Sequence, residues 1–209
     1  MIKIYNGKNT DIGQVLLRRR DDAPDVTPQV VEIIESVRSR GDKALIDYAQ
    51  KFDKARLTNL QVTEDEIDAA CQICGEDFIR LLEQAADNIR AFHNHQKRSG
   101  FVVNDKQGVV MGQKILPVAK AGIYVPGGTA AYPSSVLMNA IPAQIAGVEQ
   151  IIMVTPPLPD GSVNTAILAA AKVAGVTSVF KSGGAQAIAA LAYGTESIPQ
   201  VDKIVGPGN

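Results

Sequence analysis

Apolar side chains in the first hundred residues recur at the spacing of helices. They return every three or four residues over 30–37, which predicts one amphipathic helix. Thr27 followed by Pro28 gives an N-cap and first-turn signal for that helix. Thr63 and Glu66 have the spacing of a capping box at the start of another. This part of the chain is therefore expected to form helices.

A longer helix is predicted after Gly75. Its expected inward side chains are Phe78, Leu81, Leu82, Ala85, Ile89 and Phe92. Short strands are expected near 101–103 and 109–115, where apolar runs lose the helical period. We therefore divide this part into an N-terminal arm, 1–28, and a segment, 29–118, that is the helical and mixed part of a first α/β domain.

From residue 119 onward, short apolar runs alternate with helical segments rich in small residues. The apolar runs, each closed by Gly or Pro, are 121–125, 150–154, 176–180 and 201–205. The helical segments between them are 134–146, 165–174 and 185–192. Such alternation is typical of βαβ units with a parallel sheet. We predict an α/β fold, with a helical N-terminal layer followed by a Rossmann-like open parallel sheet over 119–209 that is incomplete at its C-terminus.

Composition and charge narrow the classes of partner. The 209 residues include 21 basic and 22 acidic side chains, for a formal charge of -1. A chain this close to neutral has no general attraction to nucleic acid or to an anionic membrane. No apolar run reaches the roughly 18 to 20 residues of a membrane span, and two cysteines make no disulfide framework. We expect a cytoplasmic protein without nucleic-acid or membrane partners.

Three of the predicted strands end in glycine loops, at 126–128, 182–184 and 206–208. In open α/β sheets, ligands bind outside the carboxyl ends of the strands. Glycine lets backbone N–H groups approach a ligand, and the next helix N-terminus favours anionic groups. No loop matches the G-x-G-x-x-G dinucleotide fingerprint. Ligand binding and simple tight turns are both compatible with the spacing.

Cys71-x-x-Cys74 and His93-x-His95 are the candidate metal ligands. On a helix, residues two apart point about 200° away from each other, so the two histidines cannot share one ion there. Cysteine is among the most buried residue types, and core packing explains that pair well. For His93 we expect a helix-end side chain hydrogen-bonded to backbone. The residues alone therefore indicate no metal site.

Several longer segments resemble histidinol dehydrogenase. They are GIYVPGG at 122–128, YPSSVLMN at 132–139, GGAQAIAALAYGT at 183–195, VDKIVGPGN at 201–209 and F-H-x-x-Q at 92–96. The resemblance implies an NAD-dependent, zinc-containing oxidoreductase that converts L-histidinol to L-histidine through the aldehyde, at the end of histidine biosynthesis. It also implies a homodimer.

The resemblance assigns cofactor contacts to Tyr124, Gln186 and Asn209. It places the zinc ligands, the glutamate–histidine pair for acid–base chemistry and most substrate contacts beyond Asn209, so no catalytic or metal residue is expected in this chain. We therefore expect the N-terminal half of such an enzyme, with the catalytic half absent and the isolated chain inactive. The alternative is a stand-alone, non-catalytic nucleotide-binding or interaction module.

Overall fold

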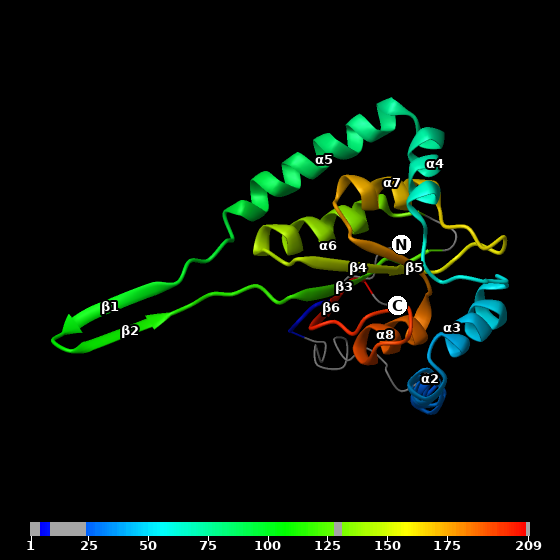
Figure 1. The fold of residues 1–209 in the computed structure, drawn as a ribbon, viewed down its shortest axis with the longest axis horizontal. Helices are drawn as coiled ribbons and strands as arrows, with labels where there is room; N and C mark the ends of the chain where they lie inside the picture. Colours follow the sequence, from blue (N-terminus) through cyan, green and yellow to red (C-terminus); the bar gives the residue numbers. More distant parts are fainter. Residues whose placement is uncertain (1–4, 9–23, 128–130, 208–209) are drawn as a thin grey trace.

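The computed structural model describes residues 5–8, 24–127 and 131–207. Figure 1 shows a parallel sheet with helices on both sides and a long hairpin that projects away from it. The elements, in chain order, are α2 (Thr27–Arg40), α3 (Asp42–Tyr48), the π-helix η1 (Ala49–Asp53), α4 (Glu64–Cys74), α5 (Glu76–Asn94), β1 (Phe101–Lys106), β2 (Val109–Gln113), β3 (Lys120–Tyr124), α6 (Pro133–Ala146), β4 (Gln150–Thr155), α7 (Thr165–Val173), β5 (Ser178–Lys181), α8 (Gly184–Tyr193) and β6 (Lys203–Val205). The predicted mixed α/β class is confirmed.

The sheet has four parallel strands in the order β5-β4-β3-β6. Its register pairs Ala121 with both Ile151 and Lys203, and it pairs Thr155 with Lys181. Strand β4 is buried from its second residue to its last. A continuous apolar run is what a strand covered on both faces requires, which is why the sequence pattern located these strands well.

Successive residues of the strands supply two separate cores. Ile151, Met153 and Val179 face one side, where they share a core with α4, α6 and α7. Ile152, Val154 and Phe180 face the other side, where they pack with α2, α3 and α8. The helices that precede the sheet in sequence are therefore divided between its two faces, as Figure 1 shows.

The outer edge of β5 is covered by an extended segment before α4. Val62 N donates to Val179 O at 2.9 Å, and Lys181 N donates to Leu60 O at 2.7 Å. Gln61 thereby forms an antiparallel bridge with Phe180. These bonds use backbone groups that an open sheet edge would leave unpaired.

The predicted N-cap is confirmed for helix α4 and is wrong for helix α2. The capping box is confirmed, because Thr63 N donates to Glu66 Oε2 at 2.8 Å and Glu66 N donates to Thr63 Oγ1 at 3.2 Å. Thr27 is not the N-cap that the sequence indicated, because it is the first residue of α2. The carboxylate of Asp25 accepts the Thr27 N–H at 2.9 Å instead.

Helix α5 and the hairpin extend past the body of the molecule (Figure 1). Leu82 is buried, as expected, and Ala86, which was not among the expected inward residues, is buried too, but Leu81 and Phe92 are 60% and 65% exposed. The expected inward face is therefore wrong at these two residues, since Leu81 lies about 100° from Leu82 on the helix and Phe92 is in its last turn. The two expected short strands are present as the antiparallel pair β1–β2.

Candidate functional site

The carboxyl ends of all four parallel strands meet at one edge of the sheet. Pro156, which follows β4, lies between two of the glycine loops there. A Cβ added at Gly127 would lie 2.8 Å from Pro156 Cγ, and one added at Gly183 would lie 2.6 Å from Pro156 Cβ. The loops after β3, β4 and β5 are thus in direct contact, and the glycines leave the room that Pro156 occupies.

The loop after β6 contacts the end of β3 at Gly206, and so lies beside the loops after β3, β4 and β5. The Gly206 φ of +142° is one that side-chain-bearing residues rarely adopt. A Cβ there would lie 2.3 Å from the backbone oxygen of Tyr124. Glycine is therefore required at 206 for the last strand-end loop to lie against the end of β3.

Two of the three residues that the resemblance assigns to the cofactor lie at Gly184, the first residue of α8. The Gly184 N–H donates to Tyr124 Oη at 3.3 Å. The side chain of Gln186 folds back over the same residue, with its Oε1 2.8 Å from the position of a Gly184 Cβ. Tyr124 is half-buried and Gln186 is buried. Asn209, the third, lies outside the described residues.

The N-terminus of α8 suits an anionic group. Gly183 is its N-cap and offers no side-chain oxygen to the first turn, which also contains no acidic residue. The first backbone N–H groups of a helix have no partner within the helix, and they favour negative charge. Helix α4, by contrast, has three acidic residues in its first turn and a capping box. Of these two N-termini, that of α8 is the one suited to a phosphate.

Two buried hydroxyl groups at the same edge were missed by the sequence analysis. Thr155 is the last residue of β4, and Ser182 follows β5. Their Oγ atoms are buried and have no hydrogen-bond partner in the described part of the chain. An unpaired buried hydroxyl is costly, so it is an observation that calls for a partner. The apolar runs before these residues predict strands, but they do not indicate a function for the polar side chain at the end of each strand.

The histidine and cysteine candidates lie elsewhere and form no metal site. His93 Nδ1 is 2.7 Å from the side-chain oxygen of Gln96, so its partner is a side chain and not the expected backbone group. Cys71 and Cys74 are free thiols packed against the core, and burial raises the pKa of Cys71. Among the described residues, no three His, Cys, Asp or Glu side chains are grouped to hold a metal ion.

An ion pair lies beside the glycine loops, at the end of β5. Lys181 Nζ is 2.5 Å from Glu66 Oε1, and only 11% of the lysine side chain is exposed. Burial raises the pKa of the Glu66 carboxyl, but the bonds from Lys181 and from Thr63 outweigh it and hold that pKa below its usual value. Glu66 is therefore ionised at neutral pH.

Comparison with known proteins identifies the family. The family model described as histidinol dehydrogenase matches residues 16–209. The histidinol dehydrogenase of Clostridium acetobutylicum is 53% identical over 192 residues, which are 92% of this chain and 44% of the relative. That of Syntrophotalea carbinolica is 50% identical over 215 residues, which cover 100% of this chain and 50% of the relative.

A solved structure agrees with these sequence matches. The crystal structure of histidinol dehydrogenase from Elizabethkingia anophelis superposes with a TM-score of 0.85 at 43% identity, over 90% of this chain and 43% of that one. The chain thus spans about half the length of the curated relatives that it matches. By sequence and by fold, this chain belongs to the histidinol dehydrogenase family.

Proposed function

We propose that this chain supplies the NAD-binding part of a cytoplasmic, homodimeric histidinol dehydrogenase. The whole enzyme would oxidise L-histidinol to L-histidine through the aldehyde, with two NAD. The observation that supports the proposal is the gathering of Tyr124 and Gln186 around Gly184 at the N-terminus of α8. No helix among the described residues is long and apolar enough to cross a membrane.

The residues at this edge fit a dinucleotide. The N–H groups at the start of α8 would hold a phosphate, and the Gln186 amide would donate to and accept from ribose or nicotinamide amide groups. The Tyr124 ring would stack on an aromatic group of the cofactor. The unpaired hydroxyls of Thr155 and Ser182 lie at the same strand ends. Bound NAD would supply the hydride acceptor, while these side chains bind and orient it.

Zinc does not fit the described residues, because they contain no group of three potential ligands. We therefore assign no step of the reaction through a metal to this chain. In the proposed enzyme, the zinc ligands, the acid–base pair and most contacts to L-histidinol come from the segment that the relatives have beyond the region matched here. The isolated 209-residue chain is accordingly proposed to be inactive, with weak NAD binding.

Replacing Gln186 with leucine is expected to weaken NAD⁺ binding about tenfold. Leucine keeps most of the buried volume but removes the amide group, and a lost hydrogen bond to a buried partner is worth about 1–3 kcal/mol. The measurement is a titration of the isotope-labelled chain with NAD⁺, followed by NMR shifts of the amides of 183–187.

Gln84→Leu is the matched control, because Gln84 is exposed on α5, away from the strand ends. It should bind NAD⁺ like the unchanged chain. Equal affinity in the folded Gln186→Leu variant, or NAD⁺-dependent shifts confined to other parts of the chain, would contradict the proposed site.

A further inference from the structure

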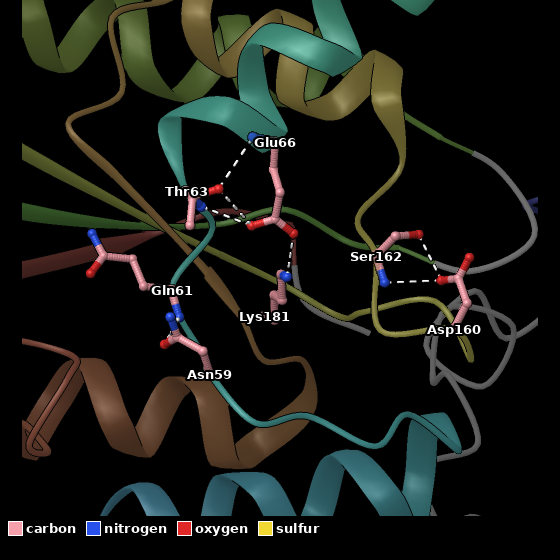
Figure 2. Close-up of polar contacts among 7 residues, drawn as sticks. All are labelled: Asn59, Gln61, Thr63, Glu66, Asp160, Ser162 and Lys181. Carbon is pink, nitrogen blue, oxygen red and sulfur yellow. Dashed lines mark hydrogen bonds and ion pairs between the residues drawn. The ribbon is translucent and has the colours of Figure 1, made fainter.

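Lys181 is the last residue of β5 and directly precedes the loop that leads into α8. Its side chain runs to Glu66, near the start of α4, and the two residues are 115 positions apart in the sequence. Figure 2 shows this contact at the centre of a group of polar side chains. The group surrounds a cavity of about 370 Å³. A long-range ion pair thus lies one residue before the proposed cofactor loop.

Glu66 is a fixed acceptor rather than a mobile surface carboxylate. Its Oε2 accepts the Thr63 N–H at 2.8 Å, while its Oε1 accepts from Lys181. Its own N–H donates to Thr63 Oγ1 at 3.2 Å. Both carboxylate oxygens are therefore engaged, and the carboxylate is tied to the first turn of α4, as Figure 2 shows.

The backbone holds Lys181 at a second point. Lys181 N donates to Leu60 O at 2.7 Å, in the segment that covers the edge of β5. The main chain and the side chain of this residue are thus both bonded to 60–66. Three residues later, the Gly184 N–H meets Tyr124 Oη. The start of the loop is held by Lys181, and its end lies at the proposed cofactor residues.

We propose that Lys181, acting through Glu66, is a positioning residue that holds the 182–184 loop and the start of α8 in place for the cofactor. The inference rests on the proposed function for the cofactor itself, but the positioning of the loop is a property of this chain alone. We propose no contact between Lys181 and the cofactor. Lys181 acts by fixing the point from which the loop departs.

The burial of the lysine favours a geometric role for the pair over a general stabilising one, since the Lys181 side chain is 11% exposed and that of Glu66 is 37% exposed. A buried charged side chain loses hydration on folding, so an apolar residue of similar volume often gives equal or greater stability. What the pair provides is a directional bond at one position. The Lys172–Asp68 pair joins the same helix α4 to α7, but its side chains are 53% and 57% exposed. The Lys172–Asp68 pair lies away from the 182–184 loop, so it serves as the comparison for the Lys181–Glu66 pair.

The test measures hydrogen exchange of the 209-residue chain in Lys181→Met, Lys181→Arg and Glu66→Gln. Methionine keeps the length of the side chain without its charge. In Lys181→Met, amides 183–187 are expected to exchange about tenfold faster, with those of α7 unchanged. Glu66→Gln should show the same local change, because it removes the charged partner but can keep its bond to Thr63 N. Lys181→Arg should restore slow exchange.

Lys172→Met is the matched control, and its exchange at 183–187 should equal that of the unchanged chain. Unchanged exchange at 183–187 in both Lys181→Met and Glu66→Gln would overturn the positioning role. So would equal acceleration in α7, since that is general destabilisation. If Lys181→Met does not fold, Glu66→Gln and Lys181→Arg decide by the same readout.

A parallel NAD⁺ titration separates this inference from the proposed function. We expect Lys181→Met to bind NAD⁺ about tenfold more weakly, with Lys181→Arg close to the unchanged chain. Unchanged NAD⁺ affinity together with a loosened loop would overturn the role for the cofactor. An unchanged chain that binds no NAD⁺ would defeat the proposed function, while the exchange data would still decide whether Lys181 holds the loop.

Discussion

Gly183→Ala is expected to reduce NAD⁺ affinity by at least about tenfold and to lower the free energy of unfolding by about 1–3 kcal/mol. The added Cβ would lie 2.6 Å from Pro156 Cβ, a distance that requires the β4 and β5 loops to move apart. That movement would displace the N-terminus of α8, which begins at the next residue. Chemical denaturation and an NAD⁺ titration measure the two effects.

Gly108→Ala is the corresponding control in the hairpin. A Cβ there meets nothing within 4 Å, although its φ of +78° makes alanine locally strained. We expect a small loss of stability and unchanged NAD⁺ affinity. If Gly183→Ala binds NAD⁺ as tightly as Gly108→Ala does, the contact between the loops does not shape the cofactor site.

Leu191→Ala is expected to lower the free energy of unfolding by about 2–5 kcal/mol, enough to threaten the fold. Leu191 is completely buried on α8, in the core on one face of the sheet. It packs onto Gly122 of β3, where a Cβ would lie 2.8 Å from Leu191 Cδ1. Because the glycine has no side chain to fill the space, truncation leaves a cavity between strand and helix. Urea denaturation followed by circular dichroism gives the value.

Ile188→Ala on the same helix tests the specificity of that result. Ile188 is 38% exposed, so its truncation removes less buried surface, and we expect a loss of about 1 kcal/mol or less. Equal losses for Leu191→Ala and Ile188→Ala would show that α8 is not packed on the sheet as described.

The sheet and its helices could be predicted because their signals are local. The apolar runs of β3 to β5 and the small-residue segments of α7 and α8 follow directly from burial on two faces. The capping box of α4 is also a short-range pattern. At Thr27 the local pattern indicated a cap, because Thr27 followed by Pro28 favours a helix start, but the cap is not formed by the Thr27 side chain. The structure uses Asp25 to accept the first N–H group.

The proposed site could be predicted only in part. The glycine loops and the resemblance indicated Tyr124 and Gln186, which lie together at Gly184. No local pattern could indicate the Lys181–Glu66 pair, because its partners are far apart in sequence. The contact of Pro156 with Gly183 likewise depends on how neighbouring strands are ordered. Exposure of Phe92 depends on where the body of the protein ends, which helical periodicity does not report.

The most direct test of the account is histidinol-dependent NADH formation. The 209-residue chain is assayed alone, and again after co-expression with the remaining segment of the Clostridium acetobutylicum relative, which is 53% identical over the matched region. We predict no NADH from the chain alone. We predict zinc-dependent NADH formation from the pair, and Gln186→Leu should lower it at NAD⁺ concentrations below saturation. Robust activity of the chain alone would contradict the account, as would a stable pair that binds NAD⁺ but never oxidises L-histidinol, the result that a non-catalytic nucleotide-binding module predicts.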